Sequence, residues 1–159
     1  MRLLALVVLL SGFSFADDLP SNLIAPGKPE TLLCDIDVHH TTLSDLRKRV
    51  ATPLSLKTHP ETEETAEIVW QQEGSRIHAT INADNIAYAV EVSGKASPIA
   101  KTGRGLAIGQ SSTEIKKIYG SRLLRRGNDI TVQWNDGTEL RVRLTSGRIS
   151  SLQLIANVE

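Results

Sequence analysis

The sequence predicts an α+β fold in which two tandem copies of a short helix each pack on an antiparallel β-meander, the two meanders forming one continuous or paired sheet. Three observations predict it. Apolar and polar residues alternate over several short runs, which is typical of half-buried strands. Two other segments carry a capping residue followed by apolar residues at helical spacing. These features occur in the same order twice along the 159 residues.

The first sixteen residues predict a secretory signal peptide. Arg2 precedes an apolar run over residues 3–10, and Ser14 and Ala16 supply small residues before a cleavage point. The run is too short for the roughly 20 residues that a membrane-spanning helix needs. We therefore expect an exported chain, periplasmic or secreted, that begins at Asp17 and has no transmembrane segment after processing.

The remaining chain divides into four segments. Three of the six prolines lie close together after the signal, which predicts a flexible leader. A polar linker that contains Pro98 separates the two predicted repeats. The segments are the leader (residues 17–30), the first α+β repeat (31–94), the linker (95–104) and the second α+β repeat (105–159).

The first repeat begins with an alternating run over residues 32–39, which predicts a half-buried strand. Thr42 is followed three residues later by Asp45, which resembles a capping box and predicts a short helix that ends before Pro53. Apolar alternation over residues 68–92 then predicts a three-stranded meander.

The second repeat follows the same order. A short strand over residues 106–108 precedes Ser111, which with Glu114 forms a capping-box pattern and predicts a helix that stops at Gly120. Alternation over residues 130–154 predicts three more strands.

Matched positions support an internal duplication. When the two repeats are laid over one another, Trp70 matches Trp134 and the turn residue Gly74 matches Gly137. Identical residues at other positions are few, so the alternative is that two small α+β units share only their patterning. We interpret the shared order of caps, tryptophans and turn glycines as a repeat.

The segment from Gly105 through the Ser111 cap to Gly120, with the strands that follow, resembles the small repeat shared by β-lactamase inhibitor protein and the BamE-type outer-membrane assembly lipoproteins. This resemblance of pattern covers residues 106–155 well and residues 32–92 loosely. It implies an exported α+β protein that binds other proteins and is not an enzyme. The chain departs from that family in having one helix per repeat, no lipobox cysteine and no aromatic-rich concave surface, so the resemblance identifies no partner.

Composition excludes several functions. Lys+Arg and Asp+Glu are balanced at 18 each, which argues against a nucleic-acid binder. Only Trp70, Tyr88, Tyr119 and Trp134 supply aromatic rings after the signal, too few for a stacking platform. Cys34 is the only cysteine, so no internal disulfide is expected. We find no catalytic motif and expect neither an enzyme nor a cofactor.

Charge placement suggests where a partner protein would bind. Glutamates cluster over residues 61–64, whereas arginines gather in the second repeat. A basic face of this kind can steer an acidic partner, although an ordinary solvated face would show the same pattern. The candidate partner-binding residues are Arg122, Arg125, Arg126, Arg141, Arg143 and Arg148.

A second hypothesis is an exported protein that binds a metal or a small ligand. Asp35, Asp37 and His39 stand at alternate positions of the predicted first strand, so their side chains would share one face. Two carboxylates and an imidazole can hold a divalent metal. The alternative is the charged outer face of an edge strand, where such residues prevent association between sheets.

Overall fold

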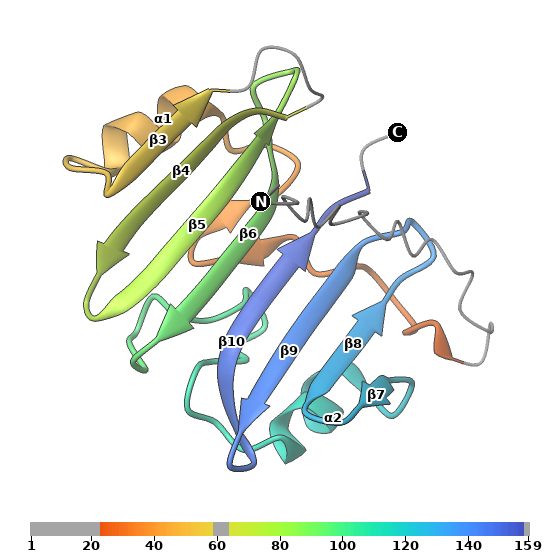
Figure 1. Cartoon of the computed structure of the whole chain (residues 1–159). Helices are drawn as coiled ribbons and strands as arrows, with labels where there is room; N and C mark the ends of the chain where they lie inside the picture. The colour runs from red at the N-terminus through yellow and green to blue at the C-terminus, as the bar shows by residue number, and fades with distance from the viewer. Residues whose placement is uncertain (1–22, 59–63, 158–159) are drawn as a thin grey trace, which may run out of the picture.

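The computed structural model describes residues 23–58 and 64–157. Its main strands are β3 (Ser55–Thr58), β4 (Glu64–Gln72), β5 (Ser75–Asn82), β6 (Ala87–Gly94), β7 (Leu124–Arg126), β8 (Asp129–Gln133), β9 (Glu139–Thr145) and β10 (Arg148–Ile155). They form one antiparallel sheet in the order β3-β4-β5-β6-β10-β9-β8-β7 (Figure 1). The helices are α1 (Leu43–Arg49) and α2 (Thr113–Tyr119), and a separate two-stranded sheet joins β1 (Leu32–Leu33) to β2 (Ile36–Asp37).

The predicted fold class is wrong. Over the described residues the protein is mostly β, with 48% strand and 12% helix, and eight strands form one large sheet, so the protein does not consist of two tandem helix-on-meander repeats. Each helix has only seven residues, too few to form a layer over half of the sheet. At the centre of the sheet, residues 151–155 of β10 pair with residues 89–93 of β6. Alternation shows which face of a strand is buried, but it does not show which strand lies beside it.

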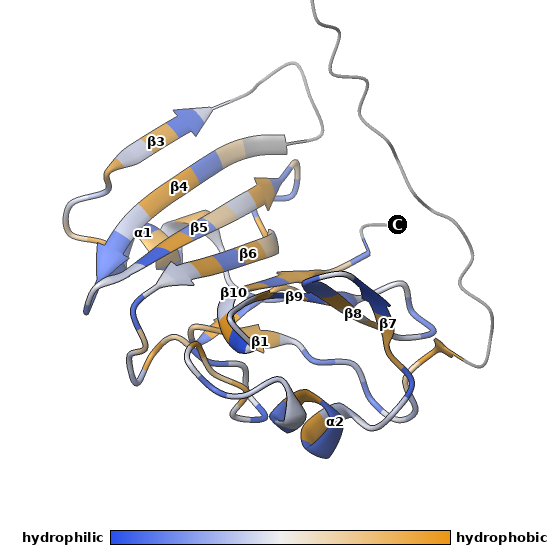
Figure 2. Ribbon diagram, turned by 60° about the horizontal axis from the view of Figure 1, so that its bottom comes forward, coloured by the Kyte–Doolittle hydropathy of each residue, from blue (hydrophilic) through white to orange (hydrophobic). Residues whose placement is uncertain are grey.

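The sheet has one covered face. In Figure 1, α1, α2 and the β1–β2 hairpin lie behind the sheet, and Figure 2 shows β1 and α2 beneath β8, β9 and β10. A single hydrophobic core fills this side. It contains Leu46 of α1, Ile115 of α2 and side chains from both halves of the sheet, β3–β6 and β7–β10. Among the described residues, no helix or strand covers the opposite face, which we call the open face.

Helix α1 was predicted correctly, because its signal is local. The Thr42 side chain accepts a hydrogen bond from the Asp45 backbone N–H over 3.2 Å, and the Asp45 carboxylate accepts one from the Thr42 N–H over 3.1 Å. These two contacts are the predicted capping box. In α2 the predicted capping box of Ser111 with Glu114 is wrong, since the helix starts at Thr113 and Ser111 Oγ accepts a hydrogen bond from the Thr113 N–H, over 3.4 Å, instead of from Glu114. The predicted end at Gly120 is confirmed.

The predicted strand over residues 32–39 is wrong. Cys34 and Asp35 have positive φ angles of 56° and 58°, and they form a two-residue turn between β1 and β2, in which Leu33 pairs with Ile36. Positive φ at both turn residues is typical of a type I′ hairpin turn. The hairpin contacts β6 and β10 from the covered side of the sheet. It therefore packs behind the junction of the two halves.

A polar network ties the segment before β1 to α2. Glu30 is 4% exposed, and its Oε2 accepts hydrogen bonds from the Tyr119 hydroxyl over 2.8 Å and from the Arg104 backbone N–H over 3.2 Å. Further along the same segment, the Ala25 N–H donates to the Gln133 carbonyl over 2.7 Å. Part of the predicted leader, from residue 23 onward, is therefore packed against the sheet and α2.

The predicted signal peptide and the glutamates at positions 61 and 63 lie outside the described residues. In the part of the chain that is described, both helices are too short to cross a membrane.

Candidate functional site

The open face is built by the outward-pointing residues of each strand. In β9, Leu140, Val142 and Leu144 are buried in the core, whereas the residues between them point outward and are half-buried or exposed. Antiparallel strands place directly opposed residues on the same face. Since Arg141 pairs with Gln153 of β10, and Gln153 with Glu91 of β6, these side chains form a row across the sheet.

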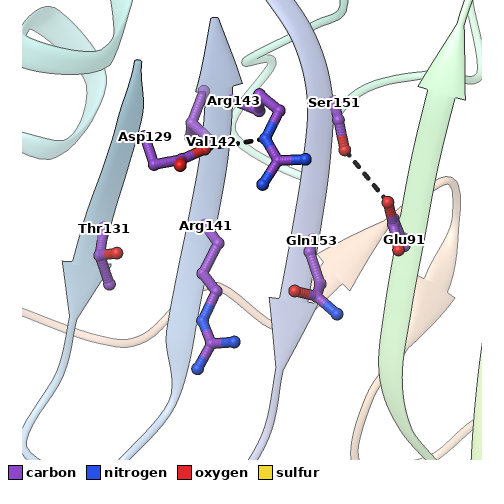
Figure 3. A pocket seen from close by; sticks show the side chains of 8 residues that line it. All are labelled: Glu91, Asp129, Thr131, Arg141, Val142, Arg143, Ser151 and Gln153. Carbon is purple, nitrogen blue, oxygen red and sulfur yellow. Dashed lines mark hydrogen bonds and ion pairs between the residues drawn. The ribbon is translucent and has the colours of Figure 1, made fainter. Parts of the chain in front are cut away.

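A second row runs beside the first. Arg143 of β9 is opposed by Ser151 of β10 on one side and by Asp129 of β8 on the other. The two rows enclose a shallow hollow of about 390 Å³ on the open face (Figure 3). Its lining residues are Glu91, Asp129, Thr131, Arg141, Val142, Arg143, Ser151 and Gln153. The hollow spans the junction between β6 and β10, opposite the β1–β2 hairpin.

The two arginines that line the hollow are already paired with carboxylates of the same chain. Arg143 Nε donates to Asp129 Oδ1 over 2.9 Å, and Arg141 Nη2 donates to Glu139 Oε2 over 2.8 Å. The hydrogen bond and the charge of Asp129 raise the pKa of Arg143 above its usual value. Both arginine side chains are well exposed, at 53% for Arg141 and 69% for Arg143. They therefore present cationic groups to solvent at the rim of the hollow.

The six candidate arginines do not form one face. Arg126 lies opposite Asp129 and so shares the open face with Arg141 and Arg143. Arg125 lies opposite the buried Ile130 and lines a separate hollow beside α2.

Arg148 at the start of β10 lies opposite Thr145 of β9, so it too is on the open face, and it donates to the Gly109 carbonyl over 2.9 Å. Arg122 lies between α2 and β7 and donates to the Ile24 carbonyl over 3.4 Å. Thus the structure brings four of the six arginines to one face, and only Arg141 and Arg143 of these line the hollow.

The three candidate metal ligands are not brought together on a strand face. Asp35 belongs to the turn between β1 and β2, and its carbonyl oxygen accepts a hydrogen bond from Arg49 over 2.6 Å. Asp37 Oδ1 accepts from the His39 backbone N–H over 2.9 Å and lies 3.1 Å from His40 Nδ1. Over residues 23–58 and 64–157, no three His, Cys, Asp or Glu side chains form a group that could hold a metal ion.

Sequence reasoning found two of the eight residues that line the hollow, Arg141 and Arg143, and missed the other six. Glu91, Ser151 and Gln153 stand at polar positions of alternating runs, so their outward direction could be predicted from the sequence. Their proximity to Arg141 and Arg143 could not, because it depends on the pairing of β6 with β10.

Comparison with known proteins shows a likeness of fold only. No family model matches the chain, and no curated protein matches it. One solved structure that is similar is a DUF4309 family protein, YjgB, from Bacillus subtilis subsp. subtilis str. 168. The two share 14% sequence identity with a TM-score of 0.50, over 77% of this chain and 82% of that chain. At this identity the likeness supports the arrangement of strands and carries no function to this chain.

Proposed function

We propose that the chain is an exported, non-enzymatic protein that binds another protein through the hollow on its open face. The partner would insert a loop that carries Asp or Glu side chains, which Arg141 and Arg143 would bind. The observation that carries this proposal is the hollow itself, a charged depression supplied by four adjacent strands on a sheet face that no described element covers.

Arg141 and Arg143 can leave their carboxylates within the chain and bind a carboxylate of another protein instead. Exposed ion pairs contribute about 0–1 kcal/mol, so leaving Glu139 and Asp129 would cost little. A guanidinium group can hold a carboxylate through two parallel hydrogen bonds, which are stronger when an interface excludes water. Because the carboxylates within the hollow balance its charge, the face would not attract anions in general, which favours a partner of matching shape.

The lining of the hollow favours a protein partner over a small ligand. Pockets for small molecules are mostly apolar and enclose their ligand. Here Val142 is the sole apolar residue of the lining, and the depression is shallow. Interfaces between proteins that associate reversibly are polar at the rim and enriched in arginine. The resemblance of residues 106–155 to β-lactamase inhibitor protein and BamE-type lipoproteins stays a prediction, and it too implies protein binding.

A charge-reversal experiment tests the proposal. The exported chain, the double variant Arg141→Glu/Arg143→Glu and the control Arg76→Glu would each be immobilised and exposed to an envelope or culture extract of the native cells. Arg76 is exposed in β5, outside the hollow, so its variant carries the same kind of charge change.

We expect one acidic protein to be recovered by the wild type and by Arg76→Glu but not by the double variant. In titration calorimetry, that purified acidic protein should bind the wild type and Arg76→Glu with similar affinity and the double variant much more weakly. Equal recovery by all three chains, with unchanged melting temperatures, would contradict the proposal.

Export is tested by processing. When the full chain is expressed in a bacterium, N-terminal sequencing of the exported form should read from Asp17. A chain that retains residues 1–16 and stays in the cytoplasm would overturn this part of the proposal.

A further inference from the structure

One edge of the sheet has an exposed apolar surface. Strand β3 pairs with β4 on one side, and no described strand pairs with its other side. Alternate residues of an edge strand turn their N–H and C=O groups away from the sheet, where they can pair with another strand. In the described part of the chain, the exposed large apolar residues are Leu32, Leu54 and Leu56. Two of these three lie in or next to β3, with exposures of 60% for Leu54 and 41% for Leu56.

The opposite edge of the sheet, formed by β7, lacks such an exposed apolar surface. Strand β7 has only three residues, two of which are Arg125 and Arg126. Short edge strands with charged side chains oppose pairing with a second sheet. Beyond the end of β7, the chain near Ile24 bridges to Gln133 and covers the next backbone groups of β8. Strand β3 is also short and carries Lys57, but it has one charged residue where β7 has two, and exposed leucines in and next to it. Of the two edges, β3 is therefore the one more open to a further strand.

We infer that β3 is a homodimerisation edge, which pairs antiparallel with β3 of a second copy of this chain. An antiparallel pair of identical strands has two-fold symmetry, which is the usual symmetry of dimers. Centring the pair on Leu56 places Leu56 against its copy, on the face of the sheet that holds the core. The same register places Ser55 opposite Lys57 of the second copy.

This register fits the chemistry of the strand. It buries the apolar side chain at the centre and sets no like charges directly opposite each other, whereas a shift that centred the pair on Lys57 would oppose two lysines. The two sheets would then continue into one another through β3. Because β3 has four residues, the interface is small, and the dimer should depend on protein concentration.

Sedimentation velocity over a wide range of concentration tests the inference. We expect the wild-type chain to show a monomer–dimer equilibrium and Leu56→Lys to weaken dimerisation at least about tenfold, since two lysines would face each other. Leu32→Lys is the matched control, because Leu32 is 37% exposed but lies in β1, away from this edge. Its dimerisation should equal that of the wild type. A wild-type chain that stays monomeric at all concentrations, or equal dimerisation of both variants, would overturn the inference.

A cross-linking experiment tests the register. Directly opposed residues of antiparallel strands have Cα atoms about 4.5–5.5 Å apart, within the range of a disulfide. With oxidised glutathione, Leu56→Cys should form a covalent dimer much faster than Leu32→Cys. Equal rates for the two variants would contradict a register centred on Leu56. Circular dichroism of each variant checks that the sheet is retained, as the exposure of both leucines leads us to expect.

Discussion

The Tyr119 hydroxyl is a buried group whose contacts join distant segments of the chain. It donates to Glu30 and lies 2.8 Å from Thr102 Oγ1. Burial raises the pKa of the Tyr119 phenol far above its usual range, so the group keeps its proton and remains a donor. Arg104 also stacks over the ring, with its Cζ 5.4 Å from the ring centre. The N-terminal segment is thus held against α2 by polar contacts as well as by packing.

We expect Tyr119→Phe to lower the free energy of unfolding by about 1–3 kcal/mol, because the substitution leaves a buried carboxylate oxygen with one donor fewer. Urea denaturation measures the loss. In a Glu30→Gln background the same substitution should cost less, since the charged acceptor is already absent. If the cost is the same in both backgrounds, the hydroxyl–carboxylate contact is not its source.

Cys34 should be chemically inert in the folded chain. The side chain is 2% exposed, and burial, followed by the charge of Asp35, raises the pKa of the thiol to about 12. The thiolate fraction at neutral pH should be about a thousandfold below that of an ordinary thiol. Iodoacetamide should therefore alkylate Cys34 slowly in buffer and fast in urea. Leu32→Cys supplies an exposed thiol in the same chain as an internal control, and equal alkylation rates at both positions would contradict the buried placement.

At the scale of elements, the capping box makes the stability of α1 depend on pH. Its hydrogen bonds with the Thr42 side chain and backbone lower the pKa of Asp45 below the usual value. A carboxyl group with a lowered pKa in the folded state stabilises that state above its unfolded pKa, and this contribution is lost as pH falls through the folded pKa.

We expect Thr42→Ala to destabilise the protein by about 1 kcal/mol at neutral pH. Asp45→Asn should also be destabilising there, and its difference from the wild type should vanish as the pH falls below about 4. Urea denaturation across pH measures both effects, with Ser44→Ala in the same helix turn as the control. A difference between Asp45→Asn and the wild type that is constant with pH would argue against the cap.

Elements with local signals were predictable from the sequence, and elements that depend on distant contacts were not. The Thr42 cap and the end of α2 at Gly120 are each encoded within a few residues, and both are confirmed. The turn at Cys34 and Asp35 carries neither glycine nor asparagine, so nothing local marked it. The hairpin forms there because Leu33, Cys34 and Ile36 all find buried positions against the sheet.

At the scale of the whole molecule, the junction of β6 with β10 makes two meanders into one sheet over one core. This pairing joins residues about 60 positions apart, as in the pair Gln153 and Glu91, and no periodicity in the sequence specifies it. The same non-local pairing assembles the hollow. For this reason Arg141 and Arg143 could be proposed from the sequence, whereas the shape of the site and its carboxylates could not.

One core implies one unfolding transition. Trp70 in β4 and Trp134 after β8 lie in different halves of the sheet, and both are buried. Trp70→Phe leaves Trp134 to report on the second half of the sheet, and Trp134→Phe leaves Trp70 to report on the first half. In each variant we expect the unfolding midpoint measured by tryptophan fluorescence to equal the midpoint measured by circular dichroism. Separate midpoints within one variant would indicate two independently folding units.

The central claim is that the hollow on the open face is the surface that meets a partner protein. Site-specific photo-crosslinking in the native cells tests it most directly, with the photoreactive residue at Gln153 in the hollow or at Arg47 on α1, which belongs to the covered side. The account expects an adduct with one protein from position 153, its loss in the Arg141→Glu/Arg143→Glu background, and no such adduct from position 47. The same adduct from both positions, or an adduct from position 47 alone, would contradict it.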